Sequence, residues 1–513
     1  MKLRPWIVVL LVVLAAATVR LRLLEMPLER DEGEYAYVGQ LMLQGVPPYQ
    51  LASNMKLPGT YSAYALILAA FGQTIAAIHL GLLLVNAGSI VLVFLLGRRL
   101  FGAAAGVAAC AAYALLSVGE GCLGTQAHAT HFVILPALGG ALLLLHHAGS
   151  GRTGTIWWSG LLFGLAFVMK QPGILFALFG ALYLIASQWR TGKALPRKLA
   201  VFLCGAAAPF AMTCLLLWRA GVFASFWFWT FTYAREYASE LSIFQGIASF
   251  CIAIARIVPP NAGIWILAAF GLWLIWRKKP AGSAAIFATL FLVFSLLAVC
   301  PGMHFRGHYF VLMFPAVALL AGAAVRNRLA CFAFCAALVL ALFVQRQFLF
   351  RMTPLQASQQ IYGTNPFSAS IRVAEYIRTH SDANSRIVVL GSEPEIPFYA
   401  GRRSATQHLY MYGLMEAQPY ALTMQNEMIR EVEAAAPQFV VRVFVQRSWL
   451  QVPQSPTRIF DWWSTYGAGH YRRVGIADIL SESRTEYRWD AAAELYQPRS
   501  DQYLAVYRRA DDR

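Results

Sequence analysis

Four ionisable side chains fall within residues 30–37, which read Arg-Asp-Glu-Gly-Glu-Tyr-Ala-Tyr. A carboxylate in such a cluster can accept a proton from a hydroxyl and make its oxygen more nucleophilic. The cluster therefore offers candidate catalytic carboxylates, and its members Arg30, Glu34 and Tyr35 are candidate substrate-binding residues. The same oxygen-rich cluster could coordinate a divalent cation. The alternative interpretation is a solvated acidic loop that does no chemistry.

Two lysines occupy positions that suit an anion. Lys56 is followed by Leu-Pro-Gly, and a lysine held there could meet a phosphate as a point charge. Lys170 lies between two apolar runs in residues 167–173, where a charge is costly and indicates a function by default. Alternatively, Lys56 only extends its ammonium group to the membrane surface, and Lys170 only lies in a short hairpin between two helices.

Histidine, arginine and tyrosine gather in residues 303–309, which read Met-His-Phe-Arg-Gly-His-Tyr. Arg306, His308 and Tyr309 could contact a phosphate or a sugar there. His131 and its neighbour His128 begin another apolar segment. A histidine at a helix boundary is more often structural, so each of these signals is weak alone. Acids suit base catalysis, cations suit a phosphate leaving group, and aromatic rings suit sugars or lipid.

The composition is that of a membrane protein. The chain has 513 residues, of which only 13% are charged, against about 25% in soluble domains, and its mean hydropathy is +0.53. Residues 1–350 hold 24 Lys and Arg but eight acids, whereas residues 351–513 hold 18 Arg, no Lys and 17 acids. The net charge of +17 follows from membrane topology, so we predict no nucleic acid partner.

About eleven transmembrane helices are expected, because each apolar run approaches the roughly 20 residues that span a bilayer. They are predicted near residues 5–24, 76–97, 103–118, 127–146, 156–169, 172–188, 199–218, 262–276, 283–300, 308–325 and 329–346. Two longer segments connect them. Residues 25–75 indicate a helix, a proline-rich stretch and a second apolar helix from Tyr61, and the aromatic residues in 219–261 suit the membrane interface.

Orientation follows from the short loops. Alternate loops carry the basic residues Lys2, Arg4, Arg98, Arg99, Arg152, Arg190, Lys193, Arg197, Lys198, Arg277, Lys278, Lys279, Arg326 and Arg328. The positive-inside rule places these loops in the cytoplasm, which puts all eight acids of residues 1–350 outside. We therefore predict a multi-pass plasma (inner) membrane protein with a cytoplasmic N-terminus. A cleaved signal peptide at the start is the alternative.

The C-terminal part is predicted to be a small extracytoplasmic α/β domain, so the fold class is an all-α polytopic membrane domain (residues 1–350) followed by this domain (residues 351–513). Helices are expected at 370–379 and 417–435, and strands at 386–390, 439–444 and 503–507, from their helical and alternating apolar patterns. None of the eight cysteines has the spacing of a metal site, so no metal-ligating residues are assigned.

Several of these segments resemble the membrane glycosyltransferases of the protein-mannosyltransferase-like group, which are glycosyltransferase family 39 and its aminoarabinose-transferase relatives with the GT-C fold. The resemblance spans residues 1–350 and is carried by motifs in a fixed order. These are Arg-Asp-Glu-Gly-Glu-Tyr-Ala-Tyr from Arg30, Lys-Leu-Pro-Gly from Lys56, Gly-Leu-Ala-Phe-Val-Met-Lys-Gln-Pro-Gly from Gly164, and Gly-His-Tyr-Phe from Gly307 with Pro315 after it.

The resemblance implies an inverting glycosyltransferase that uses a polyprenyl-phosphate-linked sugar at the outer membrane face. In that group an acidic residue of the first outer loop acts as base or positions the acceptor, which by position is Asp31 with Glu32 beside it. Basic residues surround the lipid phosphate, which suggests Lys56, Lys170, Arg306 and His308. The acceptor stays open among a lipid, a surface glycan and a protein hydroxyl. No cofactor is fixed, and a divalent cation (Mg²⁺ or Mn²⁺) stays an option.

Two departures from the group's pattern matter. Relatives often carry an acid where this chain has Thr130-His131-Phe132, so the pattern does not supply a second catalytic acid there, and Lys-Leu-Pro-Gly replaces a commoner Lys-Pro-Pro form. Two other function classes compete. A flippase or transporter for lipid-linked glycans would place polar groups at the bilayer midplane and show paired halves, and neither pattern is visible. A non-catalytic assembly protein would not need clustered acids and Lys56.

Overall fold

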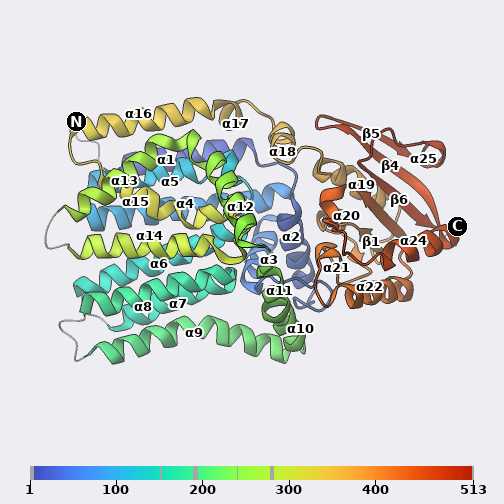
Figure 1. The fold of residues 1–513 in the computed structure, drawn as a ribbon, viewed down its shortest axis with the longest axis horizontal. Helices are drawn as coiled ribbons and strands as arrows, with labels where there is room; N and C mark the ends of the chain where they lie inside the picture. Colours follow the sequence, from blue (N-terminus) through green and yellow to red (C-terminus); the bar gives the residue numbers. More distant parts are fainter. Residues whose placement is uncertain (1–4, 151–152, 189–193, 240, 278–281, 511–513) are drawn as a thin grey trace.

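A computed structural model of the chain describes residues 5–150, 153–188, 194–239, 241–277 and 282–510. Long helices lie side by side in one part of the molecule, and a β-sheet with its own helices forms the other part (Figure 1). Shorter helices of the segments 30–71 and 223–257 lie between these two parts. The mixed α/β character expected for the C-terminal part is therefore confirmed.

The helices of the first part follow one another with short connections. Their bounds are α1 Pro5–Arg22, α2 Arg30–Leu43, α3 Pro58–Phe71, α4 Ile75–Phe101, α5 Ala103–Leu116, α6 Ala129–Ser150, α7 Thr153–Met169, α8 Ile174–Gln188, α9 Leu195–Arg219, α10 Phe223–Trp227, α11 Ala234–Ala238, α12 Ile243–Ile257, α13 Ala262–Trp276, α14 Ser283–Val299, α15 Phe314–Ala323, α16 Arg328–Val344 and α17 Arg346–Phe350. Short 3₁₀ turns include η1 Glu120–Cys122, η2 Gln171–Gly173, η4 Pro259–Asn261, η5 Pro301–Met303 and η6 Gly307–Leu312, and η3 Phe228–Tyr233 is a π-helix.

Within the described residues, five helices are long and apolar enough to cross a membrane, or six if the bent pair 223–257 is one span. The five are Pro5–Arg22, Ile75–Phe101, Ala129–His147, Leu195–Arg219 and Pro259–Trp276. Other apolar helices have 10–17 residues, and a helix that short spans the hydrocarbon core only where the bilayer or its neighbours adapt. The chain is thus a mostly helical protein with several membrane-length helices, and the count of eleven stays a prediction.

Proline explains why one expected span is short. The run expected over 308–325 divides into η6 and α15, and Pro315 stands in the first turn of α15. Proline fits that position because it lacks an N–H that the first turn would leave unpaired, but it cannot continue a preceding helix. In residues 25–75, the expected helix, proline-rich stretch and second helix are confirmed as α2 and α3.

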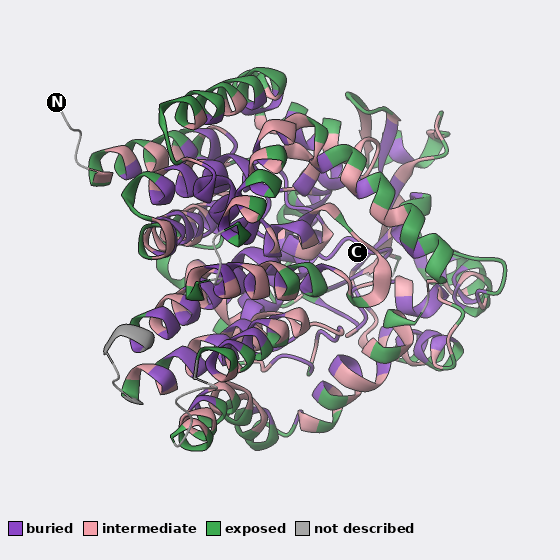
Figure 2. Ribbon diagram, turned by 60° about the vertical axis from the view of Figure 1, so that its left-hand side comes forward, coloured by how far each residue is buried: buried purple, intermediate pink, exposed green. Residues whose placement is uncertain are grey.

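Many apolar side chains face outward on the helices of the first part. Phe244 of α12 is 85% exposed, and Leu329 and Phe332 of α16 are 77% and 73% exposed. Figure 2 shows exposed residues along the outer helices and buried residues within the helical layers. A surface this apolar is typical of a lipid-facing protein. The basic residues Lys2, Arg4, Arg152, Arg190, Lys193, Lys278 and Lys279 lie outside the described residues, and the predicted orientation stays a prediction.

The C-terminal part is built around a six-stranded sheet in the order β2-β1-β3-β6-β4-β5. The strands are β1 Arg386–Leu390, β2 Arg403–Ser404, β3 Phe439–Phe444, β4 Tyr471–Ser481, β5 Arg484–Trp489 and β6 Tyr503–Arg509, and the helices are α18 Pro354–Tyr362, α19 Phe367–Thr379, α20 Glu395–Ala400, α21 Tyr412–Met415, α22 Ala421–Ala435, α23 Gln446–Trp449, α24 Arg458–His470 and α25 Ala491–Leu495. β1 pairs in parallel with β2 and β3, and the remaining pairs are antiparallel. The division into two domains at residue 350 stays a prediction.

Candidate active site

A cavity of about 690 Å³ lies where the helical part meets the C-terminal part. Its lining comes from the start of α2, residues 53–57, the turn after α7, α11, the segment 306–309 and residues of the C-terminal part. Asp31, Arg30, Tyr35, Lys56, Lys170, Arg306, His308 and Tyr309 all line it. Eight of the eleven side chains selected from the sequence therefore meet in one space, although they come from segments up to 279 positions apart in the sequence.

Two acidic side chains, Glu29 and Glu32, form a capping box at the start of α2. The Glu29 side chain accepts a hydrogen bond from the backbone N–H of Glu32, and the Glu32 side chain accepts one from the backbone N–H of Glu29. Carboxylates are favoured here because the first N–H groups of a helix are unpaired and carry partial positive charge. Gly33 has a separate role, since an added Cβ would lie 2.6 Å from the backbone N of Glu395. Glycine thus lets α20 pack directly on α2.

Asp31 is held by two donors from different parts of the chain. Lys56 Nζ lies 2.5 Å from Asp31 Oδ1 and 2.6 Å from Glu34 Oε2, and the Tyr410 hydroxyl donates to Asp31 Oδ1 over 3.1 Å. Burial alone would raise the pKa of Asp31, but Lys56 and His128 outweigh it and hold that pKa well below its usual range. Burial opposes the charge of Lys56 too, yet Asp31 and Glu34 keep its pKa above normal. Both groups are therefore charged at neutral pH.

The Lys170 segment is packed against the Lys56 segment. The Thr60 hydroxyl donates to the carbonyl of Met169 over 2.8 Å, and Gln171 Nε2 donates to the carbonyl of Met55 over 2.6 Å. Gly59 permits this approach, because an added Cβ would lie 2.4 Å from the carbonyl oxygen of Val168. The Lys-Leu-Pro-Gly and Met-Lys-Gln-Pro-Gly stretches are thus two sides of one contact.

Lys170 and Arg306 are cations of the cavity for which no ion pair is recorded among the described residues. Lys170 Nζ lies 4.3 Å from the centre of the Tyr309 ring, and Arg306 interacts with Tyr237. Burial lowers the pKa of Lys170 to about 8. Burial opposes the charge of Arg306 as well, but Tyr237 and Tyr309 raise its pKa above normal. This wall of the cavity therefore offers positive charge to an anion.

Three selected residues do not line the cavity. Glu32 is fully buried, and its Oε1 accepts from the backbone N–H of Ala127 over 2.6 Å and lies 3.0 Å from His79 Nε2. Glu34 is fully buried beneath Lys56, where it also accepts from Tyr61 and Asn54. His131 is buried within α6. Packing keeps these three groups away from the cavity surface, and the roles expected for Glu32, Glu34 and His131 stay predictions.

Comparisons with known proteins agree on the architecture. A family model described as dolichyl-phosphate-mannose-protein mannosyltransferase matches residues 58–218. The structure of ArnT from Cupriavidus metallidurans bound to undecaprenyl phosphate matches with a TM-score of 0.59 and 16% identity, over 97% of this chain and 97% of that one. The chain has the GT-C fold. No curated protein matches the sequence.

Two further GT-C structures match over nearly the whole chain. The apo oligosaccharyltransferase of Archaeoglobus fulgidus has a TM-score of 0.54 at 12% identity, covering 96% of this chain and 75% of that one. The mycobacterial arabinofuranosyltransferase AftD has a TM-score of 0.50 at 11% identity, covering 97% of this chain and 39% of that one. The match extends past residue 350 in each case, so the GT-C likeness includes the C-terminal part as well as residues 1–350.

Sequence reasoning missed some groups that the GT-C cavity contains. Tyr410, Tyr412 and Arg447 reach it from the C-terminal part, and Glu29 lies at its helical side. Burial and the neighbouring Asp31 raise the pKa of Glu29 to about 7. Glu29 could have been found as the residue that caps α2, whereas no local pattern marks Tyr410 or Arg447. Their positions depend on how the C-terminal part packs against the helices.

Arg30 ties the two parts of this GT-C chain together at the cavity rim. Its guanidinium lies 2.9 Å from Glu393 Oε1, donates to the carbonyl of Ser392 over 2.9 Å and to Asn365 Oδ1 over 3.0 Å. The Glu393 side chain is fully buried. Because these donors are already used, Arg30 has a structural role beside any contact with a substrate.

One group of side chains could hold a cation. Asp31, His128 and His308 each offer a ligand atom within 4.8 Å of the others. The imidazole rings of His128 and His308 are stacked with centroids 3.9 Å apart, and His128 Nδ1 lies 3.6 Å from both Asp31 Oδ2 and Glu29 Oε1. Burial lowers the pKa of His308 well below its usual range, so its imidazole is neutral and able to ligate. Two imidazoles and one carboxylate fit Zn²⁺ or Mn²⁺ better than Mg²⁺.

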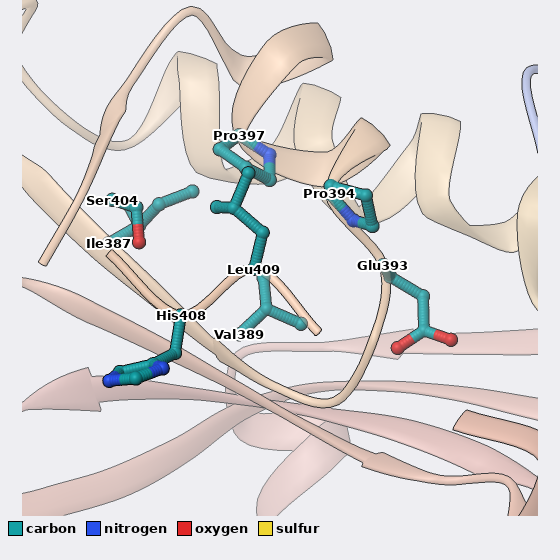
Figure 3. A pocket seen from close by; sticks show the side chains of 8 residues that line it. All are labelled: Ile387, Val389, Glu393, Pro394, Pro397, Ser404, His408 and Leu409. Carbon is teal, nitrogen blue, oxygen red and sulfur yellow. The ribbon is translucent and has the colours of Figure 1, made fainter. Parts of the chain in front are cut away.

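Another cavity lies within the C-terminal part, but it is too small to hold a substrate. It measures about 10 Å³ and is lined by Ile387, Val389, Glu393, Pro394, Pro397, Ser404, His408 and Leu409. Figure 3 shows these side chains around the loop and helix that follow β1. A space of that size accommodates about one water molecule. The cavity at Asp31 is therefore the candidate active site.

Proposed function

We propose that this chain is an inverting glycosyltransferase that moves a sugar from a polyprenyl-phosphate-linked donor to an acceptor hydroxyl at the outer membrane face. The observation that carries the proposal is the Asp31 carboxylate, paired with Lys56 on one side and sharing a cavity with the cations Lys170 and Arg306. A base and a phosphate site in one space are what such a reaction requires. The neighbouring GT-C structures include one bound to undecaprenyl phosphate, which agrees with a lipid-carried donor.

In the proposed reaction, the acceptor oxygen attacks the anomeric carbon while the bond from that carbon to the phosphate oxygen breaks. The electron pair leaves with the polyprenyl phosphate, and Lys170 and Arg306 stabilise the added negative charge. The acceptor proton passes to Asp31. Because Lys56 and His128 keep the pKa of Asp31 low, its carboxylate is a weak base that orients the hydroxyl first and takes the proton as the new bond forms.

Lys56 receives a different role from the one its motif suggested. Its ammonium contacts two carboxylates, Asp31 and Glu34, and lies over the rings of Tyr35 and Tyr410. A phosphate would have to compete with these partners. We therefore assign Lys56 to positioning Asp31, and Lys170 with Arg306 to the phosphate.

A divalent cation at Asp31, His128 and His308 belongs to the proposal as an optional component. When bound, it would supply positive charge near the leaving phosphate. His128 and His308 would hold it through imidazole nitrogens, and Asp31 through its carboxylate. The candidate acceptors are lipids, surface glycans and protein hydroxyls.

The test is release of polyprenyl phosphate from a labelled polyprenyl-phosphate sugar by the purified full-length protein with a panel of acceptors. The proposal expects release that depends on an acceptor. A flippase would instead move the labelled lipid across vesicle membranes without cleaving it, and an assembly protein would do neither. Intact donor in the presence of every acceptor class, together with transbilayer movement of the lipid, would replace this proposal with the flippase.

A further inference from the structure

A groove of about 580 Å³ lies between α4 and α6, far from Asp31. Leu95, Arg98 and Arg99 line it from α4, and Leu142, Leu143 and His146 line it from α6. Both helices begin at the active-site end, where His79 contacts Glu32 and where His128 immediately precedes α6. Arg98 is 19 residues beyond His79, which at 1.5 Å per residue places the groove about 28 Å along the helix.

The rim of the groove is basic. Arg98, Arg99 and His146 are exposed, and no ion pair is recorded for either arginine among the described residues. Glu25, Asp31, Glu120 and the other acids of residues 1–350 lie in segments outside α4 and α6. Two adjacent guanidinium groups therefore face an unfilled space, and a phosphate is the anion that their planar donors bind best.

The floor of the groove is apolar. Leu95, Leu142 and Leu143 are half-buried and face the same space as the arginines. A soluble anion would gain nothing from these leucines, whereas an acyl chain would bury them. The positive-inside rule accounts for basic residues at this end, but it does not account for a concave space that joins them to a leucine wall.

We propose that this groove binds one anionic phospholipid, with its phosphodiester on Arg98 and Arg99 and an acyl chain along the leucines. The site is independent of the glycosyl transfer proposed above, because it shares no residue with the Asp31 cavity. His146 lies on the opposite wall from the arginines and can donate a further hydrogen bond to the headgroup.

Native mass spectrometry of the full-length protein tests the site, with palmitoyl-oleoyl phosphatidylglycerol compared to palmitoyl-oleoyl phosphatidylcholine. We expect one phosphatidylglycerol to be retained roughly 10- to 30-fold more strongly than phosphatidylcholine, since each arginine near a headgroup contributes to the preference. The variant Arg98→Gln/Arg99→Gln should lose this preference. The control Arg326→Gln/Arg328→Gln removes an arginine pair at the start of α16 (Arg328–Val344), outside the groove, and should keep it.

A second variant tests the shape of the groove independently of its charge. Leu143→Trp fills the space without removing a cation, and it should lower retention of phosphatidylglycerol even if the double arginine variant does not fold. Equal retention of the two lipids by the wild-type protein would overturn the proposal. So would equal loss in the Arg326/Arg328 control, which would indicate general attraction to charge, or displacement of the lipid by millimolar glycerol 3-phosphate, which would indicate a soluble anion site.

Discussion

The Tyr410 hydroxyl donates a hydrogen bond to Asp31 Oδ1 over 3.1 Å, although the two residues are 379 positions apart in the chain. The same oxygen accepts from Lys56. The C-terminal part therefore contributes directly to the geometry of the carboxylate on which the proposed reaction depends, and Asp31 Oδ2 is the oxygen left for an acceptor or a cation.

Removal of the Tyr410 hydroxyl should weaken catalysis without abolishing it. A hydrogen bond to a charged group contributes about 1.5–3 kcal/mol, so Tyr410→Phe should lower kcat by roughly 10- to 100-fold with less effect on KM. Steady-state transfer assays measure both constants. The matched control is Tyr376→Phe, which removes a phenol that donates to Asp490 within the C-terminal part. A similar loss in both variants would show that Tyr410 acts only through folding.

The charge of Lys170 should set the alkaline limit of activity. Its pKa is lowered by burial to about 8, so the side chain is a cation below that pH and becomes neutral as pH rises through it. We expect kcat/KM to fall above about pH 8, and Lys170→Arg to move this fall to higher pH because arginine stays charged. A profile of kcat/KM between about pH 6 and pH 10 measures the shift. An unchanged alkaline limit in Lys170→Arg would exclude Lys170 as the titrating group.

The buried ion pair between Arg30 and Glu393 should hold the C-terminal part on the helices. Arg30→Gln leaves the Glu393 carboxylate buried without its partner, which typically costs about 3–5 kcal/mol, and it should lower the Tm of the purified protein. Adding Glu393→Gln removes the unpaired charge and should recover part of the loss. Thermal unfolding of both single variants and the double variant measures this coupling, and purely additive losses would contradict it.

Metal content tests the cation site without reference to activity. If Asp31, His128 and His308 form a site, the purified protein dialysed against Zn²⁺ or Mn²⁺ should retain about one ion per chain, measured by elemental analysis. His308→Gln should reduce that content and His146→Gln should not, because His146 lies at the far end of α6. Retention that is equal in wild type and His308→Gln would place the ion elsewhere.

Sequence patterns identified most of the residues that line the cavity, but they did not separate these residues from neighbours that are buried away from it. The acids of α2, Lys56, Lys170 and the 306–309 segment could be selected because charges are rare in this composition, and glycines at 33 and 59 then bring their segments together. Patterns could not distinguish Asp31 from Glu32, since neighbouring positions on a helix point in different directions. Packing against His79 and Ala127 decides that difference.

Sequence patterns predicted the apolar strands of the C-terminal part and missed its polar ones. The strands Arg386–Leu390 and Phe439–Phe444 are apolar and were predicted with their observed bounds. The hairpin of β4 and β5 was missed, because β5 (Arg484–Trp489) is largely polar and half-buried at the sheet edge. Tyr410 and Arg447 lie in segments without a regular pattern, so only the packed structure brings them to the cavity.

The central claim is that the Asp31 carboxylate performs the transfer chemistry, and Asp31→Asn tests it most directly. The amide keeps the size of the side chain but cannot accept the proton, so sugar transfer and polyprenyl phosphate release should both fall by roughly 10²–10⁴-fold. Glu120→Gln is the control, because Glu120 contacts Gln360 and does not line the cavity. Transfer by Asp31→Asn at the wild-type rate, with donor consumed equally fast, would contradict the account.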